Sequence, residues 1–224
     1  MSFKIISIDG NIGSGKSTLL THLKNYFIDN SNVIFLKEPV DEWENVKDKE
    51  GNTILQKFYE NQEKYSFSFQ MLAYISRLNL IKEAIQKNPN AIIITERSLY
   101  TDKMVFAKML YDDGFINLID YQIYMKLFES FAHEYPVHQI IYVDTTPQNC
   151  IDRIQKRSRT GETNIKLDYL INLDKYHQNM IKSISEYKTL YLNGNLDINE
   201  KPNTINVWIW MIYNFIYEIK NIES

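Results

Sequence analysis

The sequence predicts an α/β fold in which a mainly parallel sheet carries helices on both faces. Short apolar runs of strand length alternate with longer helical patterns along nearly the whole chain, as is typical of parallel sheets with helical crossovers. A glycine-rich loop also separates the first apolar run from the first helical pattern, which is the arrangement of a phosphate-binding loop. The 224 residues contain no repeat, linker or low-complexity tract. We therefore expect residues 1–224 to form one domain.

Each predicted strand is a short apolar run bounded by polar residues, glycine or proline. The five runs are Phe3–Asp9, Val33–Leu36, Ala91–Thr95, Val137–Val143 and Thr189–Leu192. The sheet is therefore expected to have about five strands.

Between the strands, apolar residues recur with the spacing of amphipathic helices. Helices are expected from the glycine-rich loop to about Ile28, over Thr53–Lys87 in two pieces, over Tyr100–Leu110, Leu118–His133, Pro147 to about Lys156, Leu167–Tyr187, and Asn203 to about Lys220. Thr146 followed by Pro147 is a helix-start pattern, with a capping residue and then proline at the first helical position. Residues 40–52 are polar, contain Gly51 and are expected to be irregular.

The bulk composition narrows the function classes. Hydrophobic residues make up 44% and charged residues 24% of the chain, as in ordinary globular proteins. The net charge of −3 argues against a nucleic-acid surface and against an anionic membrane surface. The single Cys150 excludes an intrachain disulfide and suits a reducing compartment. With no secretory or transit pattern and no apolar run long enough to span a bilayer, a cytoplasmic location is expected.

The glycine-rich loop, Gly10–Ser17, fits the P-loop pattern G-x-x-x-x-G-K-[ST] at every fixed position. Its glycines let successive backbone N–H groups turn inward around an anion, and the start of the following helix adds unpaired donors. Lys16 is expected to reach the terminal phosphates, and the Ser17 hydroxyl to hold Mg²⁺. The residues expected to bind the phosphates of a nucleoside triphosphate are Gly10, Asn11, Gly13, Ser14, Gly15, Lys16, Ser17 and Thr18.

Acidic and basic side chains follow the second and third predicted strands. Glu38 ends the second strand, and Glu96-Arg97-Ser98 ends the third. In an open parallel sheet, ligands bind at these carboxyl ends. Glu38 is placed to act as general base on a hydroxyl that attacks a γ-phosphate. Glu96 is placed to reach Mg²⁺, and Arg97 supplies a planar donor fork for phosphate or for a carboxylate.

Polar residues also lie at helical spacing within the apolar segment 66–77. Gln70, Ala73 and Arg77 fall on one helix face, where Gln and Arg are costly unless they are hydrogen-bonded. The Gln70 amide offers one donor and one acceptor, which suits the edge of a nucleobase. A solvated helix face is the plainer alternative.

An arginine cluster follows the fourth predicted strand. Arg153 and Arg157 lie one helical turn apart, and Arg159 follows in a segment with Gly161. In a chain of negative net charge, such a cluster suits a lid over phosphates. We expect this lid to cover about residues 153–164.

Taken together, these motifs resemble those of the deoxyribonucleoside kinases, closest to the deoxycytidine/deoxyguanosine kinase branch. The resemblance covers nearly the whole chain and implies a P-loop kinase fold, commonly a homodimer formed through two helices. It implies ATP or another nucleoside triphosphate as donor, with Mg²⁺, and a deoxynucleoside as acceptor. It implies Glu38 as the base for the 5′-hydroxyl with Arg97 and Lys16 beside it, Gln70 as reader of the nucleobase, and Tyr59 with Glu162 at the 3′-hydroxyl. The implied pocket walls are Trp43, Leu55, Phe58, Phe69 and Phe106.

Arg77 and Asp102 bear on the choice of nucleobase. The resemblance associates this pair with kinases of deoxycytidine, deoxyadenosine and deoxyguanosine, because thymidine-preferring members lack it. A carboxylate accepts hydrogen bonds from an exocyclic amino group, and thymine has no such group at that position. An amino-bearing deoxynucleoside is therefore the expected substrate. Lys156 departs from the pattern, since an apolar residue is expected before Arg157.

Two other readings remain open at this point. A thymidylate-kinase-like monophosphate kinase also carries Glu-Pro after the second strand. Such enzymes usually place Arg where this chain has Lys37, and Asp-Arg-Tyr where it has Glu96-Arg97-Ser98. A non-catalytic interaction subunit is the other reading. A pure scaffold has no physical need for four intact residues that this chain keeps: Lys16, Ser17, Glu38 and Glu96.

Overall fold

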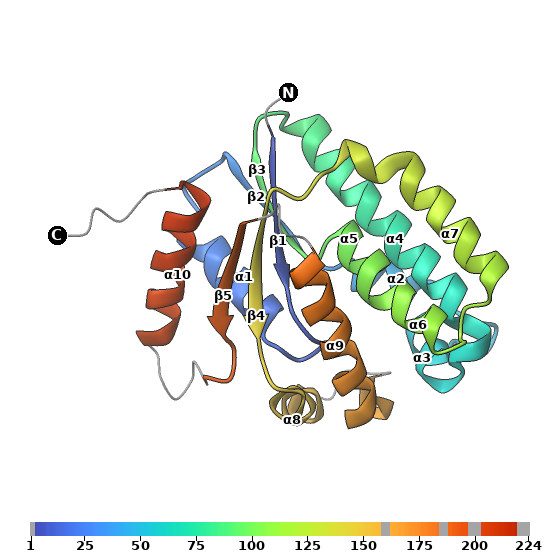
Figure 1. Ribbon diagram of the computed structural model, residues 1–224. Coiled ribbons are helices and arrows are strands. Elements are labelled where there is room, and N and C mark those ends of the chain that lie inside the picture. Colours follow the sequence, from blue (N-terminus) through green and yellow to red (C-terminus); the bar gives the residue numbers. More distant parts are fainter. Residues whose placement is uncertain (1–2, 158–161, 184–187, 197–202, 219–224) are drawn as a thin grey trace.

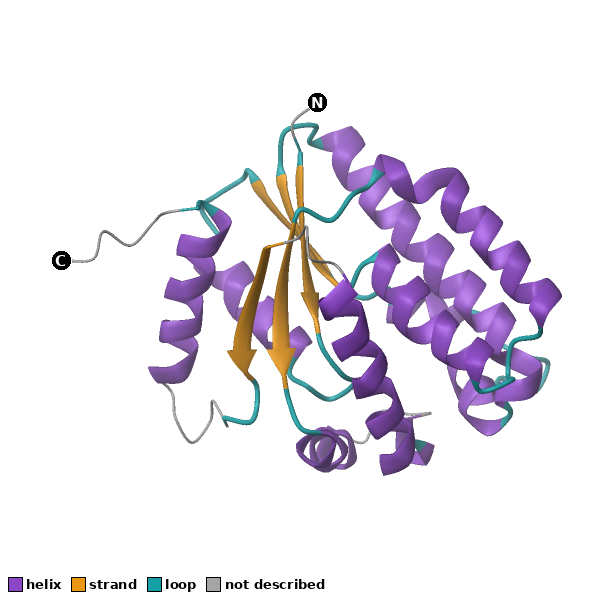
Figure 2. Ribbon diagram, in the orientation of Figure 1, coloured by secondary structure: helices purple, strands orange, loops and turns teal. Residues whose placement is uncertain are grey.

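The computed structural model describes residues 3–157, 162–183, 188–196 and 203–218 (Figure 1). At its centre lies a five-stranded sheet in the order β2-β3-β1-β4-β5. Every pair of neighbouring strands is parallel, and all the arrows in Figure 2 point the same way. The strands are β1 (Lys4–Asp9), β2 (Val33–Leu36), β3 (Ile92–Glu96), β4 (Gln139–Asp144) and β5 (Lys188–Asn193). The predicted α/β class and the expected number of strands are confirmed.

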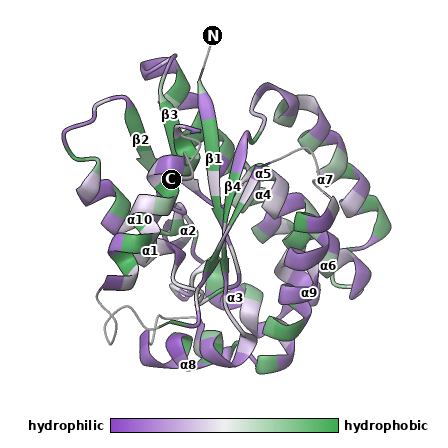
Figure 3. Cartoon of the chain, turned by 60° about the vertical axis from the view of Figure 1, so that its left-hand side comes forward, coloured by the Kyte–Doolittle hydropathy of each residue, from purple (hydrophilic) through white to green (hydrophobic). Residues whose placement is uncertain are grey.

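The central strand β1 shows why the sheet is covered on both sides. Its side chains alternate between the two faces because a strand has a period of two. Ile6 and Ile8 enter one apolar cluster, which also contains buried residues of α1 and α10. Ile5 enters the other cluster, with residues of α4, α7 and α9. Both layers are visible in Figure 1, and the apolar strands between them stand out in Figure 3.

The helices follow the predicted order. They are α1 (Lys16–Tyr26), α2 (Val40–Asn45), α3 (Ile54–Glu60), α4 (Gln62–Lys87), α5 (Leu99–Thr101), α6 (Lys108–Asp112), α7 (Leu118–Phe131), α8 (Pro147–Arg157), α9 (Leu167–Ser183) and α10 (Asn203–Ile216), with the π-helical turn η1 (Asp102–Ala107) and the 3-10 turns η2 (Ala132–Glu134) and η3 (Glu162–Asn164). The expected break within residues 53–87 falls between α3 and α4. Asn61 ends α3 there and caps α4 by accepting from the N–H of Lys64.

Two segments differ from the prediction. Residues 40–45 form a short helix, α2, where irregular structure was expected. Its Trp43 is only 5% exposed and donates its indole N–H to Ser76 Oγ at 3.0 Å, so a distant contact with α4 stabilises this turn. The helix predicted over 100–110 is interrupted by η1. In the described part of the chain, no helix has both the length and the apolar character needed to cross a bilayer.

Candidate active site

The P-loop joins β1 to α1, and close packing explains its glycines. Gly13 has a φ of +80°, and a Cβ atom there would lie 2.5 Å from the carbonyl oxygen of Cys150. At Gly10 a Cβ would lie 2.6 Å from the carbonyl oxygen of Val143. The loop therefore fits against β4 and α8 only with glycine at these positions. The peptide groups of Gly13, Ser14 and Gly15 line a cavity at the carboxyl ends of the strands.

Lys16 and Ser17 open α1 at the edge of this cavity. Burial, and secondarily the charge of Arg97, lower the pKa of the Lys16 ammonium to about 8. That ammonium donates to the backbone oxygen of Asn11 at 2.7 Å. The Asn11 side chain is turned away from the cavity and donates to the carbonyl of Leu170 in α9 at 2.9 Å. Asn11 and Gly10 lie outside the cavity lining, so their expected contact with phosphate is not visible in the side-chain geometry.

Two oxygen-bearing side chains predicted to hold a cation lie together. Ser17 Oγ donates to Glu96 Oε1 at 2.8 Å, and both residues line the cavity. Mg²⁺ prefers oxygen ligands and usually binds through one or two protein groups together with phosphates and water. The described residues contain no cluster of three or more His, Cys, Asp or Glu side chains arranged for a metal. The Ser17–Glu96 pair therefore fits a magnesium ion that is bound mainly through a nucleotide.

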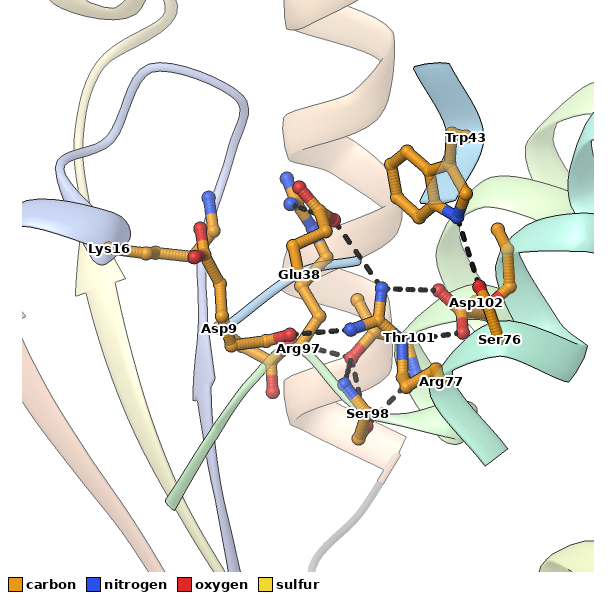
Figure 4. A network of polar contacts seen from close by, with 12 residues as sticks. Asp9, Lys16, Glu38, Trp43, Ser76, Arg77, Arg97, Ser98, Thr101 and Asp102 are labelled. Carbon is orange, nitrogen blue, oxygen red and sulfur yellow. Dashed lines mark hydrogen bonds and ion pairs between the residues drawn. The ribbon is translucent and has the colours of Figure 1, made fainter. Parts of the chain in front are cut away.

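Glu38 lies in a buried network of charges rather than in an open loop (Figure 4). Its Oε1 accepts from Arg97 Nη1 at 2.8 Å and from Arg77 Nη2 at 3.4 Å. Desolvation alone would raise the pKa of the Glu38 carboxyl, but the charges of Arg97 and Arg77 outweigh it and lower that pKa to about 2. The Glu38 side chain is 16% exposed. It is thus an ionised carboxylate with one side open to the cavity.

Arg77 connects Glu38 to the second predicted acid. Its Nε donates to Asp102 Oδ2 at 2.8 Å and its Nη2 lies 3.3 Å from Asp102 Oδ1. The third donor, Nη1, reaches the backbone oxygen of Glu96 at 2.6 Å. Asp102 comes from the π-helical turn η1, and π-helical turns recur at functional sites. The pair predicted from the sequence is therefore bidentate and buried.

The predicted acceptor pocket is one end of a cavity of about 640 Å³. Gln70 is 2% exposed, and its Oε1 has no hydrogen-bond partner within the described residues. A buried amide oxygen left in this state is costly unless a ligand or water completes it. The predicted residues that line this end are Glu38, Trp43, Leu55, Tyr59, Phe69, Gln70, Arg77, Arg97, Asp102, Phe106 and Glu162.

Phe58 is the exception among the predicted walls. It is 1% exposed and packs behind Phe69, with 4.8 Å between the ring centroids, so it supports the wall without lining it. Phe58 lies outside the cavity lining, so its expected contact with a ligand is not visible in this geometry. From α3, the side chains that face the cavity are those of Leu55 and Tyr59, which lie one helical turn apart.

The lid arginines approach the P-loop from α8. Arg153 Nη1 donates to the backbone oxygen of Ser14 at 3.2 Å, and Arg157 pairs with Glu162. All three side chains of Arg153, Arg157 and Glu162 line the cavity. Arg159, also predicted for the lid, lies outside the described residues.

The sequence leaves the other end of the cavity unassigned. Asn149, Asp152 and Lys156 share a helical face of α8 with Arg153, and together they line a groove whose far side is formed by Gly194, Asn195, Leu196, Ile205 and Trp208. The spacing of the α8 residues was a usable signal. The contribution of α10 was not, because nothing local links Trp208 to the P-loop.

A P-loop at the end of a central parallel strand, with an ionised carboxylate opposite and cations above, defines a phosphoryl-transfer enzyme of the P-loop class. Comparison with known proteins gives the particular family: residues 6–216 match the deoxynucleoside kinase family, and the chain belongs to it. It is therefore a nucleoside kinase, with a nucleoside triphosphate as phosphate donor and a nucleoside as acceptor.

Three relatives illustrate this similarity. A probable deoxycytidine kinase of Fowlpox virus is 34% identical, over 96% of this chain and 89% of the relative. Human deoxycytidine kinase is 32% identical, over 90% and 88%. The mitochondrial deoxyguanosine kinase of Xenopus laevis is 31% identical, over 81% and 74%.

Proposed function

We propose that this kinase transfers the γ-phosphate of ATP to the 5′-hydroxyl of deoxycytidine, deoxyadenosine or deoxyguanosine in preference to thymidine. The observation that carries this proposal is the buried Arg77–Asp102 pair, with side chains 3% exposed, on the same pocket wall as Gln70. Relatives named deoxycytidine kinase and deoxyguanosine kinase support it. We further propose that residues 1–224 act as one domain in the cytoplasm.

The nucleobase is selected by complementary hydrogen bonding. Gln70 offers an unpartnered acceptor beside its amide donors. Asp102 remains an acceptor even when Arg77 holds both of its oxygens, because a carboxylate has about four lone-pair positions. An exocyclic amino group can donate hydrogen bonds to these acceptors. The carbonyl of thymine cannot, because a carbonyl and a carboxylate are both acceptors and repel each other. Ala73, which also lines the pocket, leaves room for a purine.

Glu38 is the proposed acceptor of the proton from the 5′-hydroxyl. A carboxylate with a pKa of about 2 is a weak base, so it orients the hydroxyl first and takes the proton as the new phosphorus–oxygen bond forms. This order suits the loose transition state of phosphoryl transfer, in which the nucleophile needs little early activation.

Arg97 and Lys16 are the proposed cations for the transferred group. The Nε and Nη2 of Arg97 are buried without a partner among the described residues and are available to phosphate oxygens, while its Nη1 fixes Glu38. Lys16 serves the β- and γ-phosphates. Ser17 and Glu96 would hold Mg²⁺, which neutralises charge on the triphosphate. The lid arginines Arg153, Arg157 and Arg159 close over the donor.

Tyr59 and Glu162 are the proposed contacts of the 3′-hydroxyl. Both line the acceptor end of the cavity, and burial raises the pKa of the Tyr59 phenol well above its ordinary value, so this residue stays a hydrogen-bond donor. A homodimer through α7 is also proposed, because this helix exposes Leu118, Ile119 and Ile123.

The decisive experiment offers ATP·Mg²⁺ with each deoxynucleoside and each deoxynucleoside monophosphate and measures which acceptor gains a phosphate. We expect transfer to deoxynucleosides, with thymidine the poorest. Thymidine turnover equal to or above that of the others would refute the base preference, and transfer to monophosphates alone would refute the acceptor class.

Glu38→Gln tests the proposed base. It should slow the chemical step by about 10²–10⁴-fold while deoxynucleoside binding, followed by intrinsic tryptophan fluorescence, is largely kept. Glu42→Gln changes an exposed carboxylate on α2, the short helix that follows Glu38; it is the matched control and should keep full activity. An unimpaired Glu38→Gln enzyme would exclude Glu38 as the base.

A further inference from the structure

Arg97 has an unusual backbone conformation for the residue it is. Its φ is +63°, in the left-handed region that residues with a Cβ seldom adopt. Among the described residues, the only other non-glycine residue with positive φ is Glu218, near the end of α10. Such strain persists where the surrounding structure over-determines it. The turn at Arg97 directs its guanidinium toward Glu38, at 2.8 Å, and over the ring of Phe106, with 5.0 Å between Cζ and the ring centroid.

A chain of buried hydrogen bonds runs from this turn to the residue before the P-loop (Figure 4). Asp9 is fully buried, and its Oδ1 accepts from Thr101 Oγ1 at 2.5 Å. Thr101 Oγ1 in turn accepts from a backbone N–H at 3.1 Å, that of Ser98, which directly follows Arg97 in the chain. The backbone N–H of Arg97 itself donates to the carbonyl of Ile8 at 3.0 Å. Both sides of the strained residue are therefore tied to the end of β1.

The hydrogen bond from Thr101 to Asp9 fixes the direction of its neighbours. Thr101 Oγ1 donates to Asp9 Oδ1, and a hydroxyl has one proton only, so the proton of Thr101 is committed to Asp9. Thr101 Oγ1 then has only lone pairs for Ser98, and the 2.9 Å contact between the two hydroxyls must be donated by Ser98. The second carboxylate oxygen of Asp9 accepts from Ser7 Oγ at 2.5 Å. Ser7 thus shares the carboxylate but has no contact with the turn.

We propose that Asp9 and Thr101 are positioning residues that hold the left-handed turn of Arg97 in a fixed place relative to the P-loop. Asp9 directly precedes Gly10, the first residue of the P-loop. Its carboxyl group therefore connects the P-loop to the turn of Arg97, which pairs with Glu38. The pair sets the distance between the two halves of the reaction without touching either substrate. This inference rests on the proposed roles of Arg97 and Glu38.

Thr101→Val is the informative change, because it keeps the shape of the side chain and removes the hydroxyl. Thr101→Ser retains the hydroxyl and is the rescue variant. Ser7→Ala removes the other hydrogen bond to the same buried carboxylate and is the matched control for lost stability. Two functional readouts are used: the kcat and KM for the best deoxynucleoside, and the hydrogen exchange of backbone amides in residues 96–101. The melting temperature of each variant is measured beside them as the check on stability.

We expect Thr101→Val to lower kcat by about 10- to 100-fold, with the deoxynucleoside KM changed less than about two-fold, and to expose the amides of Arg97 and Ser98 to exchange. Thr101→Ser and Ser7→Ala should stay near the wild type in both readouts. If Thr101→Val does not fold, Thr101→Cys, whose thiol is a weaker donor, takes its place.

Unchanged exchange at residues 96–101 in Thr101→Val would overturn the proposal, as would an equal loss of kcat in Ser7→Ala at equal loss of melting temperature. A wild-type protein that phosphorylates no deoxynucleoside would refute the proposed function instead. The exchange measurement needs no activity and still decides the positioning role in that case.

Discussion

The bidentate pair of Arg77 and Asp102 allows a sharp test of how the site is stabilised. Both side chains are 3% exposed and meet at 2.8 Å. Asp102→Asn keeps the shape of the side chain and one acceptor oxygen but removes the negative charge. Arg77 is then left as a buried cation with the carbonyl of Glu96 at 2.6 Å and Glu38 at 3.4 Å.

The expected cost follows from that partial compensation. Removal of one partner from a buried ion pair typically destabilises a protein by about 3–5 kcal/mol. Because Arg77 keeps two oxygen partners, we expect the lower end, about 3 kcal/mol. For a chain of this size, about 2–4 °C of melting temperature corresponds to each kcal/mol. The melting temperature of Asp102→Asn should therefore fall by about 6–12 °C.

Urea denaturation of four proteins measures this effect: the wild type, Asp102→Asn, Arg77→Met and the double variant. The double variant should lose less free energy of unfolding than the sum of the two single variants, because it leaves no unpaired charge. Glu83→Gln is the control, since Glu83 and Lys87 form an exposed pair with side chains 62% and 73% exposed; its cost should stay below about 1 kcal/mol. A cost below about 1 kcal/mol for Asp102→Asn, or strictly additive losses, would refute the reasoning.

Three further outcomes are expected. The pKa of Glu38 is lowered from 4.5 to about 2, so its ionisation stabilises the fold above a pH of about 4.5, and this contribution disappears as the pH falls toward 2. The difference in free energy of unfolding between wild type and Glu38→Gln, measured by urea denaturation, should therefore shrink between pH 4.5 and pH 2; a constant difference would contradict the lowered pKa. Lys16 has a pKa of about 8 and should be fully protonated beside a triphosphate, so binding of ATP·Mg²⁺ at pH 8 should take up about half a proton per site. Calorimetry in buffers of different ionisation enthalpy measures this uptake, and uptake that persists in Lys16→Met would assign the proton to another group. Lys156 lines the cavity on the α8 face beside Arg153, where we propose that the donor binds. Lys156→Met should therefore raise the KM for ATP by about five-fold, the equivalent of about 1 kcal/mol, without changing the KM for the deoxynucleoside; a change in the deoxynucleoside KM alone would place Lys156 at the acceptor.

Several features of the site could be derived from the sequence because they depend on local pattern. The P-loop is contiguous, and its strand–loop–helix context follows from periodicity. The carboxyl ends of parallel strands share one edge of a sheet, so the sequence alone predicts that Glu38 and Glu96 lie near the P-loop. The spacing of Gln70 and Arg77 on one helix face likewise predicted their common orientation, and the structure places both on the cavity wall.

Other features depend on contacts between residues far apart in the chain. Trp43 forms its short helix against Ser76, and no local signal in residues 40–52 contains that contact. Phe58 and Phe69 have similar chemistry, yet only the packing of α3 on α4 decides which of them lines the cavity. The groove lined by Asn149, Lys156 and Trp208 forms only where α8, α10 and the residues after β5 meet.

The sequence by itself therefore determined the class of chemistry: a triphosphate at Gly10–Ser17, faced by carboxylates and arginines at neighbouring strand ends. Only the tertiary structure decided the state of these groups. Glu38 proved to be an ion-paired carboxylate of low pKa, and the turn of Arg97 proved to be tied to Asp9 through Thr101, 92 residues along the chain from it. The physical reason is that residue type and spacing set which groups approach one another, whereas protonation and backbone strain depend on burial and on every charge nearby.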